Sequence, residues 1–152
     1  MGNVRVCLVA SAGGHLTQLL KLAQSWAGYD AVYVTTSEAV AGELQKRGPV
    51  YIVGESNRRQ PLRTAKVFGQ CVKILAKERP DVIISTGAAA GCLMCLLGKL
   101  RGAKVLWVDS IANVRRISMS GRIIRPFADV FLTQWPELAS NDNKIRYVGE
   151  LI

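Results

Sequence analysis

The sequence predicts an α/β fold, a Rossmann-like open parallel sheet with helices on both faces, in a single domain over residues 1–152. Short segments rich in Val, Ile and Leu alternate with longer segments of helical periodicity along the whole chain. The short segments are almost continuously apolar, which is typical of parallel strands buried on both faces. Glycine and proline stand at the junctions, as expected where helices end. In such folds, ligands bind outside the carboxyl ends of the strands, near a reversal of strand order.

Seven segments have the composition of buried strands: 4–10, 31–35, 50–53, 82–85, 104–108, 130–133 and 145–148. The segments between them predict helices because their apolar residues recur three and four positions apart, as Leu16, Leu19 and Leu20 do after the first strand. The predicted helices are 14–26, 38–47, 61–78, 88–100 and roughly 120–127, with a short turn near 136–140. Gly48-Pro49, Arg79-Pro80 and Arg101-Gly102 separate three of these helices from the strands that follow.

The composition excludes several classes of protein. An apolar content of 49% and a mean hydropathy of +0.18 exclude a disordered chain. The longest apolar stretch, 88–97, is much shorter than the ~18 residues typical of a membrane span. The first strand follows so closely on Met1 that we expect no signal peptide or anchor. Four cysteines in a strand-and-helix protein favour reduced thiols. We therefore expect a soluble or peripheral cytoplasmic protein.

The net charge of +9 is concentrated in two segments that contain no acidic residue, 56–77 and 110–128. The basic residues of the first segment are Arg58, Arg59, Arg63, Lys66, Lys73 and Lys77, and those of the second are Arg115, Arg116, Arg122 and Arg125. Such segments suit an anionic membrane surface, a phosphorylated substrate or a nucleic acid, and a solvated surface is the plain alternative. A nucleic-acid partner is disfavoured because interleaved aromatic residues for base stacking are absent from the sequence pattern.

The predicted helix 61–78 has an apolar face and a narrow basic stripe. We assign Ala65, Phe68, Val72, Leu75 and Ala76 to the face that meets the core. Val67 and Ile74 fall beside the basic stripe, where we expect them to be exposed. A basic stripe flanked by exposed aliphatic residues predicts contact with anionic lipid. The alternative is an ordinary covering helix whose lysine stems lie along apolar surface.

Two glycine turns predict a phosphate site. Ser11-Ala12-Gly13-Gly14-His15 follows the first strand, and Ser85-Thr86-Gly87-Ala88 follows the fourth. Each turn leads into a helix, whose free N–H groups and dipole favour an anion. If the two strands are neighbours, the turns can hold the two phosphates of one pyrophosphate. Neither turn matches the Walker or G-x-G-x-x-G pattern, so a dinucleotide enzyme is disfavoured.

His15 is the single histidine of the chain and is a candidate general base, because imidazole exchanges protons near neutral pH. The alternative is a histidine that caps the helix start or is simply exposed. Asp109 and Ser110 follow the fifth strand at the same predicted edge, either as ligand contacts or as an N-cap. Cys92 and Cys95 are predicted to be buried core thiols rather than zinc ligands, since further ligands are lacking nearby.

Six motifs taken together resemble a known family. They are Ser11-Ala12-Gly13-Gly14-His15, Ser85-Thr86-Gly87-Ala88, Asp109-Ser110-Ile111-Ala112, Ser120-Gly121-Arg122, Pro126-Phe127-Ala128-Asp129 and Gln134-Trp135-Pro136-Glu137-Leu138. In this order, over nearly the whole chain, the motifs resemble those of the PssD-type subunits of bacterial exopolysaccharide and capsule glycosyltransferases. Those subunits are related to the membrane-recruiting subunit of the eukaryotic transferase that adds the second GlcNAc to dolichol-pyrophosphate-GlcNAc.

The resemblance implies that the chain corresponds to the N-terminal, acceptor-side half of a GT-B glycosyltransferase such as MurG. A separate donor-binding subunit would hold a UDP-sugar, and the pair would transfer the sugar, with inversion, to a polyprenyl-pyrophosphate-linked glycan at the cytoplasmic face of the membrane. No metal and no cofactor is expected. His15 is then the catalytic candidate, and Ser11, Gly13, Gly14, Ser85, Thr86, Gly87 and Ala88 are candidates for holding the acceptor pyrophosphate. Asp109, Ser110, Arg115 and Arg116 are candidates for acceptor or interface contacts, and the basic residues of segment 56–77 for membrane contacts.

The chain departs from the family pattern at one position. Family members usually carry Glu where this chain has Asp109, and the shorter side chain leaves the role of the carboxylate open. We also expect no N-terminal hydrophobic anchor of the eukaryotic kind. A second hypothesis is a non-catalytic adaptor, which recruits a partner transferase to the membrane and contributes no catalytic residue.

Overall fold

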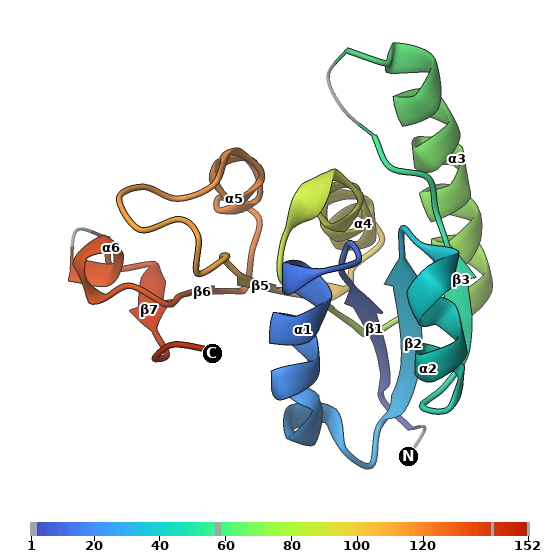
Figure 1. Cartoon of the computed structure of the whole chain (residues 1–152), viewed down its shortest axis with the longest axis horizontal. Helices are drawn as coiled ribbons and strands as arrows, with labels where there is room; N and C mark the ends of the chain where they lie inside the picture. The colour runs from blue at the N-terminus through green and yellow to red at the C-terminus, as the bar shows by residue number, and fades with distance from the viewer. Residues whose placement is uncertain (1–2, 57–58, 141, 152) are drawn as a thin grey trace.

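The computed structural model describes residues 3–56, 59–140 and 142–151, and these residues build a seven-stranded parallel sheet with helices on both faces (Figure 1). The strands are β1 (Arg5–Val9), β2 (Asp30–Thr35), β3 (Val50–Ile52), β4 (Val82–Ser85), β5 (Lys104–Val108), β6 (Val130–Thr133) and β7 (Ile145–Tyr147). All seven predicted strands are confirmed, and none of their ends moves by more than one residue. The predicted fold class is therefore correct.

The helices are α1 (Gly14–Lys21), α2 (Ala41–Gln45), α3 (Pro61–Glu78), α4 (Ala88–Leu100), α5 (Met119–Ile124) and α6 (Pro136–Ser140). Two predicted helices are divided. The segment 14–26 becomes α1 and the 3₁₀ helix Ala23–Trp26, and 38–47 becomes the 3₁₀ helix Glu38–Val40 followed by α2. The helix predicted over 120–127 ends at Ile124, because Pro126 lacks an N–H group and cannot continue it. None of the helices in the described ranges has the length and hydropathy needed to cross a membrane.

The strand order is β3-β2-β1-β4-β5-β6-β7, so the direction in which strands are added reverses between β1 and β4. Two apolar cores lie on opposite faces of the sheet. One contains Leu19 of α1 and Leu44 of α2, and the other contains Leu75 of α3 and Met94 of α4. The helices therefore cover both faces, and the reversal places the β1–α1 and β4–α4 connections next to each other at the carboxyl edge, where ligands bind in folds of this kind.

The structure corrects the predicted orientation of α3. Val67 and Ile74, which we expected to be exposed, are buried against the sheet together with Cys71. Phe68 and Val72, which we assigned to the core, are 47% and 39% exposed. The prediction was wrong because α3 has two apolar faces, and helical periodicity does not reveal which of them meets the sheet.

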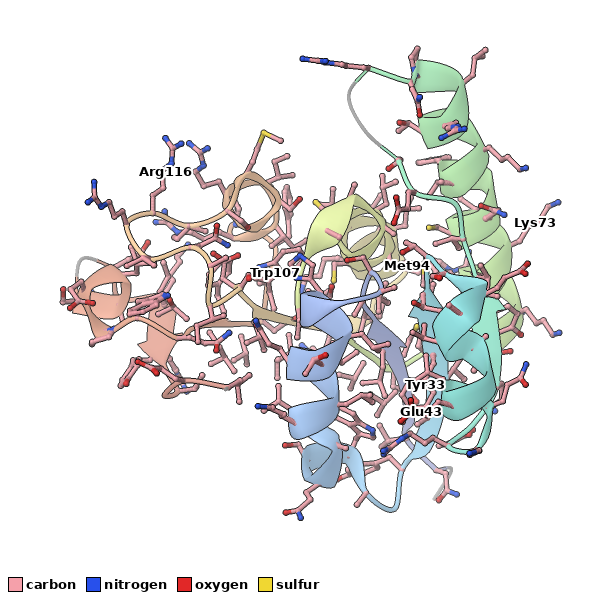
Figure 2. All side chains as sticks on the ribbon, viewed as in Figure 1. Tyr33, Glu43, Lys73, Met94, Trp107 and Arg116 are labelled. Carbon is pink, nitrogen blue, oxygen red and sulfur yellow. The ribbon has the colours of Figure 1, made fainter. Side chains whose placement is uncertain are left out.

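The basic stripe of α3 lies on the surface, as predicted. Its residues Arg63, Lys66, Lys73 and Lys77 are exposed, and Figure 2 shows Lys73 extending away from the helix. Arg59 is exposed just before the helix, and Arg58 lies outside the described residues. Beside the stripe runs an exposed apolar face, which contains Leu62, Ala65, Phe68, Val72 and Ala76. A lipid-contacting surface on α3 would therefore use these residues instead of Val67 and Ile74.

Asp129 joins three elements at the amino edge of the sheet. Its carboxylate accepts hydrogen bonds from Nζ of Lys99 at 2.8 and 2.9 Å and from the backbone N–H of Val105 at 2.8 Å. Partial burial raises the pKa of Asp129, but the bonds from Lys99 and Val105 outweigh this effect and hold the pKa below its ordinary value. A carboxylate of this kind stabilises the fold above its unfolded pKa, and the stabilisation is lost as pH falls through the folded pKa.

We expect Asp129→Asn to lower the free energy of unfolding at neutral pH by roughly 1–2 kcal/mol, because it weakens the charge-assisted bonds from Lys99 and Val105. Urea unfolding should show that the difference from wild type shrinks between neutral pH and about pH 2. Glu43→Gln, on the exposed surface of α2 (Figure 2), is the matched control and should have little effect at either pH. A loss of equal size at both pH values would contradict this account of Asp129.

Candidate functional site

The two glycine turns lie next to each other at the carboxyl edge of the sheet. The first joins β1 to α1 and the second joins β4 to α4, and β1 pairs with β4 so that Val9 lies opposite Ser85. The expectation that the two strands are neighbours is therefore confirmed. Figure 1 shows α1 and α4 beginning at this same edge.

Both helices present their N-termini without a capping side chain. Gly13 and Gly87 occupy the N-cap positions of α1 and α4, and neither helix has an acidic residue in its first turn. The first-turn N–H groups and the positive ends of two helix dipoles thus remain for a ligand. This arrangement favours an anion with two charged groups, such as a pyrophosphate.

His15 links the two turns. Its Nδ1 lies 2.9 Å from the carbonyl oxygen of Thr86, and the hydroxyl of Thr86 donates back to the carbonyl of His15 at 2.6 Å. Because a carbonyl oxygen accepts but never donates, Nδ1 carries the proton in this arrangement. The neutral ring then has its lone pair on Nε2, which is the nitrogen able to accept a proton from a substrate.

The backbone at the second turn has little freedom. Gly87 has φ 136°, and a Cβ atom there would lie 2.6 Å from Cε1 and 2.7 Å from Nδ1 of His15. The next residue, Ala88, has φ 69°, a conformation that alanine rarely adopts. The imidazole ring therefore packs directly on Gly87, at a position where only glycine leaves enough room.

A cleft of about 280 Å³ opens at this turn. His15 reaches it from α1, and Thr86, Gly87 and Ala88 reach it from the second turn. The remaining lining residues come from the loop after β5 and from the start of α5: Asp109, Ser110, Ala112, Asn113, Ser118, Met119 and Ser120. The structure thus brings His15 and the second turn into one cleft, together with a loop whose contribution the sequence indicated only through Asp109 and Ser110.

Asp109 differs from its predicted role as an acceptor or interface contact. Its side chain is 1% exposed, and its carboxylate accepts bonds from Trp107 Nε1 at 3.1 Å and from the hydroxyl and N–H of Ser118 at 2.6 and 2.9 Å. Ser118 in turn caps α5 by accepting from the N–H of Gly121 at 2.9 Å. Asp109 therefore positions the loop that forms one wall of the cleft, and its oxygens are already occupied by protein donors.

Ser85 also needs correction as a direct phosphate contact. It is fully buried, and its hydroxyl accepts from the N–H of Gly87 at 3.2 Å inside the turn. A Cβ atom at Gly91 of α4 would lie 2.1 Å from this hydroxyl, which shows how closely α4 packs over it. Ser85 supports the turn and does not face the cleft.

The residues that line the cleft do not include the other predicted site residues that the structure describes. Ser11, Gly13 and Gly14 form the neighbouring first turn, and a Cβ atom at Gly14 would meet no atom within 4 Å. Arg115 and Arg116 are exposed and do not line the cleft, and Figure 2 shows Arg116 extending from the loop between β5 and α5. Their predicted contacts with the acceptor or a partner remain predictions.

Sequence reasoning missed Ser118 and Asn113 as cleft residues. The signal for Ser118 was present, since a serine three positions before Gly121 at the start of a helix is typical of an N-cap. Asn113 had no such signal, because it lies in a loop whose path depends on the buried bonds of Asp109.

A buried amide joins α1 to the C-terminal segment. Gln134, fully buried after β6, donates to Oε1 of Gln18 at 2.8 Å and to the carbonyl of Asp109 at 3.0 Å. Its own Oε1 accepts from the N–H of Leu151 at 2.8 Å. Gln134 therefore holds three parts of the chain together. They are α1, which carries His15, the start of the loop after β5, and the backbone at Leu151.

All four cysteines are buried, which confirms the predicted role of Cys92 and Cys95 as core residues. Cys7, Cys71, Cys92 and Cys95 are free thiols, and burial raises the pKa of each, to about 11 for Cys71. A buried thiol with a raised pKa is a poor nucleophile and metal ligand. Within the described ranges, no group of three or more His, Cys, Asp or Glu side chains is placed to hold a metal ion.

Comparison with solved structures defines the class of fold. MurG of Acinetobacter baumannii matches with a TM-score of 0.78 at 16% identity, over 95% of this chain and 45% of the MurG chain. The UDP-GlcNAc 2-epimerase of Methanocaldococcus jannaschii matches with a TM-score of 0.72 at 16% identity, over 97% and 46% of the two chains. The chain thus has the architecture of the N-terminal half of a GT-B glycosyltransferase and spans about half the length of these structures. Because a transferase and an epimerase share it, the fold alone does not choose the reaction.

Comparison of sequences shows the family. A profile described as "Oligosaccharide biosynthesis protein Alg14 like" matches residues 50–151. The UDP-N-acetylglucosamine transferase subunit ALG14 of Yarrowia lipolytica is 28% identical, over 99% of this chain and 82% of that protein. The Homo sapiens subunit of the same name is 25% identical, over 99% and 84%. The chain belongs to the Alg14 family.

The geometry at His15 predicts a measurable tautomer. Because the chain has one histidine, all imidazole signals in an NMR spectrum belong to this side chain. We expect correlations between ring nitrogens and protons to show the Nδ1–H form when the ring is neutral, because Nδ1 donates to Thr86.

Two glycine variants provide the test and its control. Gly87→Ala should shift the His15 signals, because the added methyl group would overlap the ring. Gly14→Ala should leave them nearly unchanged, since its methyl group meets open space. An Nε2–H form in the wild type, or equal shifts in both variants, would show that the ring is held differently.

Proposed function

We propose that this chain is the acceptor-binding, membrane-associated subunit of a two-component inverting glycosyltransferase. The partner subunit binds a UDP-sugar, and the acceptor is a polyprenyl-pyrophosphate-linked glycan. The observation that carries the proposal is the adjacency of two uncapped helix N-termini and the His15 ring where the strand order reverses. The curated relatives are each named as a subunit of UDP-N-acetylglucosamine transferase, which supports both the reaction class and the need for a partner.

The acceptor pyrophosphate binds across the two glycine turns. Each phosphate meets the N–H groups of one helix, α1 or α4, and the absence of an acidic residue in either first turn supports this placement. The open space around Gly14 allows close approach of a phosphate to the backbone. Asp109 holds the loop 110–118 over the other side of the acceptor through Ser118.

The transfer is a single displacement at the anomeric carbon of the donor sugar. The acceptor hydroxyl oxygen forms the new bond to this carbon while the bond to the UDP oxygen breaks, and UDP leaves with the electron pair. Nε2 of His15 accepts the proton of the attacking hydroxyl. Nδ1 stays bound to the carbonyl of Thr86, so this carbonyl stabilises the imidazolium that forms. The sugar configuration inverts because one bond replaces the other from the opposite side.

The proposed membrane contact uses the outer surface of α3. The exposed apolar face enters the lipid headgroup region, and the adjacent stripe of Arg63, Lys66, Lys73 and Lys77 meets anionic lipid. The biological setting we propose is polysaccharide biosynthesis at the cytoplasmic face of the membrane, with the PssD-type subunits of exopolysaccharide and capsule assembly as the bacterial counterparts. Such a contact places the carboxyl edge of the sheet near its lipid-linked substrate.

Replacing His15 separates a catalytic subunit from an adaptor. In the reconstituted pair, His15→Ala and His15→Asn should each lower kcat by about 10²- to 10⁴-fold, because both lack a base at this position. Asn keeps an amide donor for the Thr86 carbonyl, so it tests the base without removing that bond. Lys21→Ala at the far end of α1 is the control variant and should leave kcat unchanged. Without its partner subunit, the chain should show no transfer with any UDP-sugar. Normal turnover by both His15 variants, with vesicle binding intact, would instead establish the adaptor.

The basic stripe should make membrane binding sensitive to salt. We expect the triple variant Lys66→Glu, Lys73→Glu, Lys77→Glu to lose most co-sedimentation with vesicles rich in anionic phospholipid at low salt, since each basic residue contributes about 1 kcal/mol. A second variant, Leu62→Ser with Phe68→Ser, should weaken the binding that persists at high salt. The control carries the same charge change at exposed positions elsewhere, Lys21, Lys46 and Lys144. Equal losses in the test and control triples would rule out a contact centred on α3.

A further inference from the structure

A second hollow, of about 460 Å³, lies beside the cleft, between α3, α4 and α5. Its walls are mainly hydrocarbon, and the side chains that supply them are Ala89, Cys92, Leu93 and Leu96 of α4 with Met119 and Ile123 of α5. Among the residues that the structure describes, those that line it carry no charged side chain. We call this hollow the α4 groove.

The structure assigns the α4 groove to the hydrocarbon chain of the lipid-linked acceptor, at the isoprene units next to the pyrophosphate. This inference rests on the proposed function, because it assumes that the pyrophosphate binds at the glycine turns. It adds a binding site for the part of the substrate that neither His15 nor the turns would touch.

The groove and the cleft are neighbours that share lining residues. Met119 and Ser120 line both of them, at the start of α5. The helix α4 also runs from one to the other: its N-terminus at Gly87 and Ala88 faces the cleft, and Ala89, Cys92 and Leu96 follow at helical spacing along the groove. A ligand with a phosphate at one end and an apolar chain behind it matches this order of surfaces.

The chemistry of the walls excludes the other parts of the substrate. A glycan needs many hydrogen-bond partners, and the described part of the chain supplies the groove with three hydroxyl-bearing side chains, Ser56, Thr64 and Ser120. A second phosphate would lie far from the helix N-termini and beside apolar side chains. A hydrocarbon chain, by contrast, gains free energy from each methylene group that it buries there.

The groove also opens towards the surface that we propose to meet the membrane. Ile123 on its α5 side is 47% exposed, and Leu62, in the same first turn of α3 as Thr64, is 86% exposed. The helix α4 packs against both α3 and α5, and Figure 1 shows it between them. A hydrocarbon chain in the groove would therefore lie beside the surface that we propose to meet the membrane.

Binding of farnesyl pyrophosphate and of inorganic pyrophosphate to the full chain, measured by calorimetry, tests the inference. We expect farnesyl pyrophosphate to bind at least tenfold more tightly, which corresponds to about 1.4 kcal/mol or about two buried methylene groups. Leu96→Trp, which enlarges a partly exposed side chain of the groove two turns along α4, should remove most of this preference while leaving the affinity for inorganic pyrophosphate unchanged. Ile123→Asn, at a half-exposed position of the groove, should reduce the preference in the same way. Leu100→Trp, at the exposed far end of α4, is the matched control and should keep it.

The outcomes distinguish this inference from the proposed function. Equal affinities of the wild type for the two probes, or a preference that survives in both groove variants, would overturn the α4 groove as a lipid site and leave the phosphate site standing. Failure of the wild type to bind either probe would contradict the phosphate site itself and, with it, the inference that rests on it.

Discussion

The pairing of β1 with β4 is the constraint on which the candidate site depends. These two strands lead into α1 and α4, which cover opposite faces of the sheet, so the two connections diverge and leave a crevice between them. Side-by-side strands bring two helix N-termini within reach of one ligand, and the bonds between His15 and Thr86 join the connections across the crevice. If α1 and α4 covered the same face of the sheet, their side chains would fill this space.

The wall of the cleft on the β5 side depends on buried polar groups rather than on regular structure. Asp109 holds Ser118, Ser118 caps α5, and Gln134 fixes the carbonyl of Asp109 to α1. Each of these groups would be costly to leave without a partner, because burial removes the water that would otherwise solvate it. The loop 110–118 is therefore ordered by the same network that anchors the C-terminal segment through Leu151.

The fold could be predicted from the sequence because its signals are local. Apolar β-branched strands, helical spacing and Gly or Pro at the junctions each depend on a few neighbouring residues, and all seven strands were placed to within one residue. The position of the two glycine turns followed from the rule for open parallel sheets. Errors arose where a residue's environment is set by distant parts of the chain.

Three residues illustrate these errors. Val67 is buried because the sheet meets one of two apolar faces of α3, a choice made by tertiary packing. Ser85 looked like a phosphate ligand, but α4 closes over its hydroxyl. Asp109 follows a strand at the ligand edge, yet the donors that turn it inward, Trp107 and Ser118, become neighbours only when the loop folds back.

The three-sided character of α3 has a kinetic consequence. One side packs on the sheet, one is exposed and apolar, and one is basic. On the proposed contact, the second and third sides hold the helix axis along the bilayer surface, so the protein travels in the same plane as a lipid-linked acceptor. The encounter between them becomes a two-dimensional search, and its rate depends on the surface density of acceptor in the membrane rather than on its concentration per unit volume of cell.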